Sequence, residues 1–157
     1  MKLTLRFATL FLLPLPAYLS LCTPVRAASI DENLPDAQAL AQLEIRAQQA
    51  GPRDQCFLYT ELVHTMTEIA GKQMLNGDID QASDTLKKVS KYAQLIHVSL
   101  ADNTKRLKNA ELLLHHTTYR LGEYLHKASS EDRDTLNTTL KQLDKVHDEL
   151  LAEVLKH

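Results

Sequence analysis

Apolar residues recur at helical spacing along almost the whole chain from residue 35 onward. Positions three and four residues apart share one face of an α-helix, so this repeat predicts amphipathic helices and not strands. The chain has only 4 glycines and 5 prolines in 157 residues, too few for the many tight turns of an all-β fold. Because this length fits one domain, we expect a single all-α domain.

Glycine, proline and serine divide this region into helical segments. Gly51 and Pro52 end the first segment, and proline at a first helical position opens the second. The second segment ends at Asn76–Asp78, where Gly77 suits a left-handed cap. Ser129 and Ser130 precede the last segment, and acidic residues follow them, as a helix start favours. The pattern therefore predicts four to five helices.

The joint around residues 101–104 leaves two architectures open. It contains no glycine or proline, and apolar positions continue through it at heptad spacing. A bend there gives an antiparallel helical bundle of four to five helices. Without a bend, two helical hairpins share one long continuous helix through 101–104. We favour the bundle because it buries every apolar stripe within one molecule.

The stretch Gly77–Ala82, followed by Leu86 and Val89, resembles the inter-helix turn of a tetratricopeptide repeat. The resemblance covers one turn. No second copy follows at the 34-residue period of that family. We therefore take no function from it.

The first 27 residues have the pattern of a signal peptide. Lys2 and Arg6 precede an apolar run over residues 7–21, and Val25 and Ala27 have the small-residue spacing of a cleavage site. We expect a signal peptide over 1–27, a helical domain over 28–157, and an exported protein, periplasmic or extracellular, with no membrane span after cleavage. The alternatives are membrane anchoring by an uncleaved signal or by lipidation of Cys22, although Leu21 is not the small residue that such lipidation requires.

The charge balance argues against nucleic acid as a partner. Removing residues 1–27 takes away three of the 18 basic residues and none of the 20 acidic ones. The remaining chain is acidic, and aromatic residues make up only 5% of the sequence. Proteins that bind nucleic acid carry basic patches, so we expect no such partner.

Cys56 is the one cysteine left after cleavage, so no internal disulfide can form. Free cysteines are often buried, and we expect Cys56 to be a free thiol that packs as a small apolar residue. The alternative is an intermolecular disulfide in an oxidising compartment.

Several polar residues lie within or beside the apolar stripes. In the bundle, Tyr59, His97, Glu111 and His147 fall at similar heights along the helix axes, with His115 nearby. The main interpretation is a buried hydrogen-bonded layer that fixes the helix register. The alternative is a small-ligand or transition-metal site held by His97, Glu111 and His147. Apart from that alternative, we expect no cofactor.

Two acid–histidine pairs have the Glu-x-x-His spacing of metal sites in helical bundles, Glu61/His64 and Glu123/His126. At 100° per residue, both pairs fall on the polar side of their helices. We therefore expect them to be solvated and not to bind a metal.

A second stripe follows one flank of the segment that contains Leu114. It consists of His115, Tyr119, Gly122 and His126, about 100–120° from the apolar stripe. Gly122 has no Cβ and permits another backbone to approach closely. We expect this flank to bind an unknown protein partner or a second copy of the chain. The simpler alternative is a partly exposed helix flank.

The sequence contains no catalytic motif that we recognise. The chain has no Gly-x-Ser-x-Gly, His-Glu-x-x-His or Cys-x-x-Cys-His sequence. We therefore expect a binding or interaction module and not an enzyme. The alternative function is a four-helix bundle that binds a metal or small ligand through core histidines.

Overall fold

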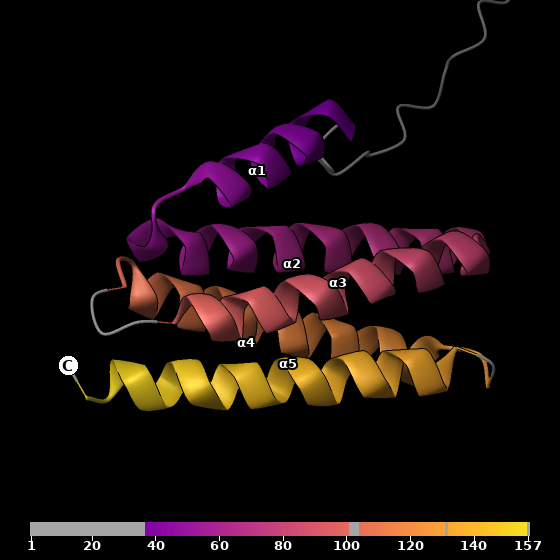
Figure 1. Ribbon diagram of the computed structural model, residues 1–157. Helices are drawn as coiled ribbons and strands as arrows, with labels where there is room; N and C mark the ends of the chain where they lie inside the picture. The colour runs from indigo at the N-terminus through magenta and orange to yellow at the C-terminus, as the bar shows by residue number, and fades with distance from the viewer. Residues whose placement is uncertain (1–36, 101–103, 131, 157) are drawn as a thin grey trace, which may run out of the picture. The chain divides into compact units, whose positions relative to one another are not determined.

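The computed structural model describes residues 37–100, 104–130 and 132–156, and these contain helices and no strand. The helices are α1 (Ala37–Gln49), α2 (Pro52–Asn76), α3 (Ile79–Ser99), α4 (Leu107–Lys127) and α5 (Arg133–Val154) (Figure 1). The prediction of an all-α helical bundle is confirmed. The predicted signal peptide over 1–27 and Cys22 lie outside the described residues. None of the described helices is long and apolar enough to cross a membrane.

The first two helix boundaries follow the glycine and proline signals. Pro52 occupies the first turn of α2, where its missing N–H has no intrahelical partner to lose. Gly77 ends α2 in the left-handed conformation, with φ of 84°. The N–H of Gly77 donates to the Met74 carbonyl at 3.1 Å, and that of Asp78 donates to the Gln73 carbonyl at 2.8 Å. These bonds satisfy two helix-end carbonyls, so the predicted left-handed cap is confirmed.

Helix α3 ends at Ser99 and α4 begins at Leu107, so the alternative of one continuous helix through 101–104 is wrong. Leu100 is extended, and Arg106 adopts the left-handed conformation with φ of 56°. Two contacts tie the turn to the start of α2. The Lys105 N–H donates to the Arg53 carbonyl at 2.8 Å, and the Arg106 guanidinium lies 3.6 Å from the centre of the Phe57 ring.

Helices α2 to α5 form a four-sided bundle in which α2 contacts α3 and α4, and α5 contacts α3 and α4 (Figure 1). The consecutive pairs α2/α3 and α4/α5 are antiparallel hairpins. The two hairpins pack side by side, with α2 against α4 and α3 against α5. The helices of each of these two pairs run parallel to one another. Helices α3 and α4, although consecutive, therefore lie on a diagonal of the bundle.

The core of the bundle is built from the predicted apolar stripes. Leucine, isoleucine and valine side chains from all four helices are at most 1% exposed. Burial of each such side chain contributes about 1.5–3 kcal/mol relative to exposure. The largest of them are Leu62, Val63, Leu86, Val89, Ile96, Leu114, Leu121, Leu136, Leu143 and Leu150.

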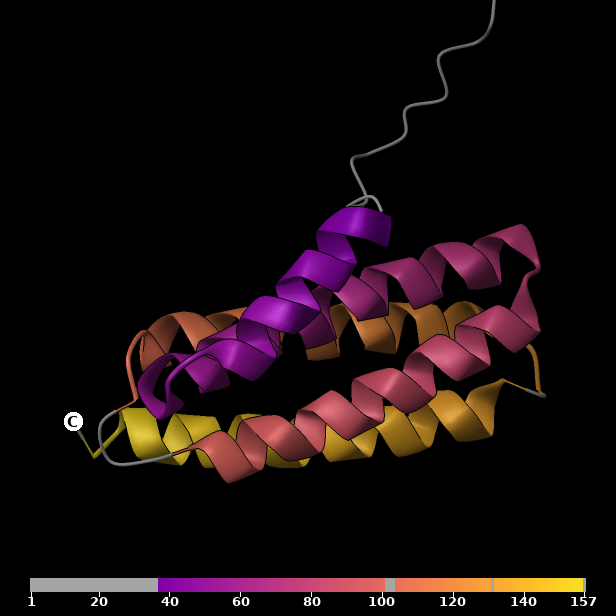
Figure 2. The same ribbon diagram turned by 45° about the horizontal axis from the view of Figure 1, so that its top comes forward.

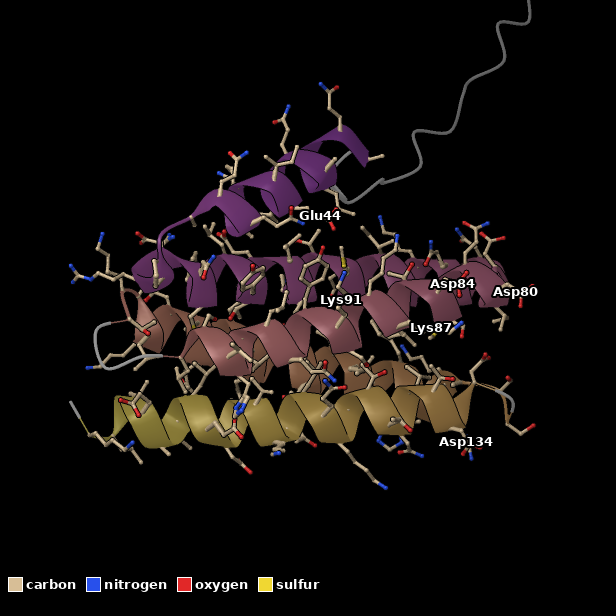
Figure 3. The ribbon with its side chains drawn as sticks, viewed as in Figure 1. Glu44, Asp80, Asp84, Lys87, Lys91 and Asp134 are labelled. Atoms are coloured by element: carbon tan, nitrogen blue, oxygen red, sulfur yellow. The ribbon has the colours of Figure 1, made fainter. Side chains whose placement is uncertain are left out.

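Helix α1 packs against α2 and crosses it obliquely (Figure 2). Ala47 is its one fully buried residue, and Leu40 and Leu43 pack on the core while remaining half-buried. Glu44 faces the α2/α3 pair (Figure 3), and its carboxylate accepts a hydrogen bond from the Tyr92 hydroxyl of α3. Helix α1 is therefore attached at one side of the bundle.

Candidate functional site

The predicted flank of α4 is exposed at His115, Tyr119 and His126 and half-buried at Gly122. Leu107, Ala110, Leu114 and Leu121 turn inward on α4, and the flank lies about 100–120° around the helix from this buried stripe. His115 and His126 are exposed, Tyr119 is 64% exposed, and Leu112 continues the row one turn earlier with 55% exposure. We call the row Leu112, His115, Tyr119, Gly122 and His126 the α4 face.

The spacing of the α4 face is that of a helix–helix seam. Its members follow one another at intervals of three, four, three and four residues. This alternation is the a/d pattern of a coiled coil, in which side chains of one helix insert between those of another. The four buried stripes of the bundle already use the inward faces, so the α4 face is an additional seam.

Gly122 has no role in the packing of its own chain. A Cβ built on it meets no atom within 4 Å, and its φ is not positive. The glycine nevertheless lies in the interior of α4, where it costs about 1 kcal/mol relative to alanine. By contrast, Gly71 lies against the Tyr124 ring, and Gly77 needs its left-handed conformation.

Glu111 and His147 meet at the α4/α5 seam. The Nε2 of His147 lies 3.0 Å from Oε1 of Glu111, and the two side chains are 17% and 22% exposed. The ring of His115 lies 5.3 Å from that of His147, centre to centre. The structure thus brings together two members of the predicted polar layer and the nearby His115.

His97 is not a member of this group. Its Nδ1 lies 2.5 Å from Oε2 of Glu149, and its side chain is 58% exposed. Glu149 follows His147 by two residues, which turns the two side chains about 200° apart on α5. His97 therefore lies at the α3/α5 seam, apart from Glu111 and His147.

Tyr59 is also separate from the other members of the predicted layer. It is buried and stacks on Tyr92 with ring centres 5.9 Å apart. The predicted single polar layer is therefore wrong, because its members lie at three different seams. Across residues 37–100, 104–130 and 132–156, no three or more His, Cys, Asp or Glu side chains are grouped so that they could hold a metal ion. The metal alternative stays a prediction.

The sequence analysis missed a polar network at the α2/α4 seam. The Nε and Nη2 of Arg120 donate to the two carboxylate oxygens of Glu68 at 3.1 and 3.2 Å. The Tyr124 hydroxyl donates to Glu68 at 2.9 Å, and Arg120 also donates to Glu123 at 2.6 Å. This network joins the two parallel helices. The sequence signal for this network was the spacing of positions 117, 120 and 124, three and four residues apart on α4. These positions adjoin the apolar stripe on the side away from Glu111.

His64 belongs to the same seam, so its predicted solvated position is wrong. It is half-buried, and its Nδ1 lies 3.0 Å from the hydroxyl of buried Thr117. The buried face of α2 is wider than its apolar stripe because it includes Thr60, Thr67 and Gly71. The hydroxyls of Thr60 and Thr67 donate to the carbonyls of Cys56 and Val63, which allows these polar residues to be buried.

We expect acidification to destabilise the fold through His64. Burial holds the pKa of His64 below its ordinary value, despite the opposing field of Glu68. The unfolded chain therefore binds the proton more readily, so the free energy of unfolding falls as pH drops below about 6.5. A His64→Gln variant should lose less stability between pH 7 and 5 in urea titrations. Exposed His126→Gln is the control, and a slope equal to that of His64→Gln would contradict the assignment.

Glu68 titrates in a lower range. Burial alone would raise its pKa, but the hydrogen bonds from Arg120 and Tyr124 and the charge of Arg120 lower it overall. Its contribution to stability is therefore complete above its ordinary pKa and is lost as pH falls through the lowered value. This window lies below that of His64, so the two groups are distinguishable.

Cys56 is buried, as expected, with an exposed fraction of 0%. It lies in the first turns of α2. Burial raises the pKa of the thiol to about 11, although a hydrogen bond with Ser99 acts in the opposite direction. A thiol with this pKa carries little thiolate at neutral pH, which makes Cys56 a weak nucleophile while it stays buried.

Three hollows among the described residues lie away from the α4 face. Two follow one another along the α3/α5 seam, with volumes of about 420 and 240 Å³. Small and polar side chains line them, including Ser90, Thr139 and Gln142. A third, of about 230 Å³, lies between the ends of the hairpins against Leu75 and Tyr124. Met74, Ile79 and Ala128 also line the third hollow.

Comparisons with protein-family models, curated proteins and solved structures found no match.

Proposed function

We propose that the protein is an exported interaction module that binds a helix of a protein partner through the α4 face. The observation that carries the proposal is the row of exposed side chains at a/d spacing, with Leu112 at 55% and Tyr119 at 64% exposure. Leucine and tyrosine in such a row are the side chains that fill the spaces between residues of a facing helix.

The composition of the α4 face supports protein binding. Aromatic residues are enriched in the buried centres of protein interfaces, and tyrosine is frequent among the residues that contribute most to affinity. Tyr119 lies at the middle of the face, with two members on either side. The bundle core also holds α4 rigidly from behind, so little order is lost when a partner binds.

The sequence supports the other two parts of the proposal. Lys2, Arg6 and the apolar run that follows them have the order of a secretory signal. The chain also lacks the nucleophile and metalloprotease motifs named above. A binding role outside the cytoplasm is therefore preferred to a catalytic one.

A photocrosslinking experiment tests the proposal. A photoreactive phenylalanine analogue replaces Tyr119 in the full chain, expressed in a cell with an export pathway. We expect irradiation to give one discrete protein adduct in the exported fraction. The matched control carries the same analogue at Val98 of α3, which is 75% exposed and lies outside the α4 face. No adduct from position 119, or equal adducts from both positions, would refute docking at the α4 face.

A further inference from the structure

Gly122 is the feature of the α4 face that its own chain does not explain. Open space surrounds the position of its missing Cβ. A glycine at an a/d position leaves a gap in the seam on one side of the helix. The largest side chain of the face, Tyr119, lies one turn away. The α4 face thus carries a large projecting side chain at Tyr119 and, at Gly122, a gap into which such a side chain could insert.

We propose that the α4 face binds the α4 face of a second copy, with the two helices antiparallel. The proposal deepens the proposed function, on which it rests, by naming the partner. In antiparallel pairs, each a residue packs against a d residue of the other helix. One register then places Tyr119 over Gly122 of the second copy. A two-fold axis repeats the same contact in the opposite sense.

The same register pairs two further members of the face and leaves Leu112 opposite position 129, beyond the end of α4. His115 lies opposite His126 of the second copy, and both are exposed in the single chain. Beside the seam, His116 lies opposite Glu123 of the second copy, again twice. A histidine ring and a carboxylate form a hydrogen bond, which becomes an ion pair when the ring is protonated. The register therefore joins complementary groups at its centre and at its edges.

Glu123 is held at the edge of the face by its own helix. Its carboxylate accepts a hydrogen bond from Nη1 of Arg120 at 2.6 Å, and its side chain remains 35% exposed. Arg120 is bound from its other side by Glu68. The carboxylate is therefore positioned before association, which reduces the order lost on binding.

The size of the face sets the expected strength. Two helices of 21 residues each, touching along one stripe, form a smaller interface than those of obligate dimers. We therefore expect a reversible dimer with a dissociation constant of micromolar order. The full chain is expressed in a cell with an export pathway, and the exported protein is purified. Sedimentation equilibrium over a range of concentrations then measures the dissociation constant.

Filling the gap at Gly122 tests the central contact. We expect Gly122→Leu to weaken the dimer by at least roughly tenfold, because the new side chain occupies the space of Tyr119 from the second copy. Lys88→Leu adds the same side chain to an exposed site of α3 and should leave the dissociation constant unchanged. Thermal unfolding of both variants confirms that they fold. A folded Gly122→Leu variant that dimerises as the parent does overturns the proposal.

A charge exchange tests the register. His116→Glu places two carboxylates together at each edge, and Glu123→Lys removes the acceptor, so each change alone should weaken the dimer. The double variant restores opposite charges only across the antiparallel pair, since positions 116 and 123 are seven residues apart in one helix. We expect it to recover most of the lost affinity. Failure of the double variant to exceed both single variants overturns the register.

The photocrosslinking result separates this inference from the proposed function. An adduct of twice the chain mass supports both. An adduct with a different protein, from a chain that sediments only as a monomer, refutes the second copy as the partner and leaves the proposed function standing. Absence of any adduct at position 119, together with a monomer, refutes both.

Discussion

Replacement of Gly71 by alanine is expected to destabilise the protein by about 2 kcal/mol, the middle of the range for overpacked cores. An ideal Cβ at this position would lie 2.1 Å from Cζ and 2.3 Å from Cε2 of Tyr124, so the ring must move. The ring cannot move freely, because the Tyr124 hydroxyl is bonded to Glu68 and Arg120, each at 2.9 Å. Alanine has a better helix propensity than glycine, but this gain of about 1 kcal/mol is smaller than the cost of displacing the Tyr124 ring.

Urea unfolding of three variants measures this effect. In a Tyr124→Ala background the ring is absent, so Gly71→Ala should cost nothing there and the two changes should be strongly non-additive. Gly122→Ala is the matched control on another helix, where open space predicts a gain of up to about 1 kcal/mol. If Gly71→Ala is as stable as the parent protein, the close packing of α4 on α2 is not as described.

Modification of Cys56 by iodoacetamide is expected to be at least about a hundredfold slower in the folded protein than in the unfolded chain. The raised pKa of about 11 lowers the thiolate fraction near pH 8 by roughly that factor relative to an ordinary thiol. Complete burial adds a steric barrier to the reagent. The folded protein should therefore react only through transient opening of the bundle.

Mass spectrometry of timed samples, with and without urea, measures the two rates. Rapid modification under native conditions would show that the start of α2 opens readily. The result also bears on an intermolecular disulfide through Cys56. Such a bond requires the thiol to leave the core, so native dimers of this protein should persist under reducing conditions.

The sequence predicts the helices well because their signals are local. Gly77 ends α2 through its own backbone conformation, and the leucines of each stripe fix which face turns inward. The residues around 101–104 carry no comparable signal for the end of α3, because the apolar heptad spacing continues through them. The turn depends on contacts between distant residues, namely Arg106 with Phe57 and Lys105 with Arg53. Sequence spacing within one helix carries no information about them.

The candidate site shows the same division. Helical geometry alone placed His115, Tyr119 and His126 on an exposed flank, and all three are exposed. The polar layer failed because residue counting gives height along a bundle and not position around it. Helices α3 and α4 lie on a diagonal, so His97 of α3 does not meet Glu111 of α4, whereas His147 on the adjacent α5 does.

The parallel placement of the hairpins also gives the bundle an electrical asymmetry. Where α3 and α5 begin side by side, two positive helix-dipole ends add, and the ends of α2 and α4 beside them are both negative. Each end of the bundle is thus divided into a positive and a negative half, which the alternating dipoles of an all-antiparallel bundle would cancel. Asp80 and Asp134 occupy the first turns of α3 and α5, and Figure 3 shows them at this end together with Asp84. The positive dipole end of each helix stabilises the aspartate in its own first turn, and the Asp84 carboxylate is paired with Lys87 at 2.7 Å.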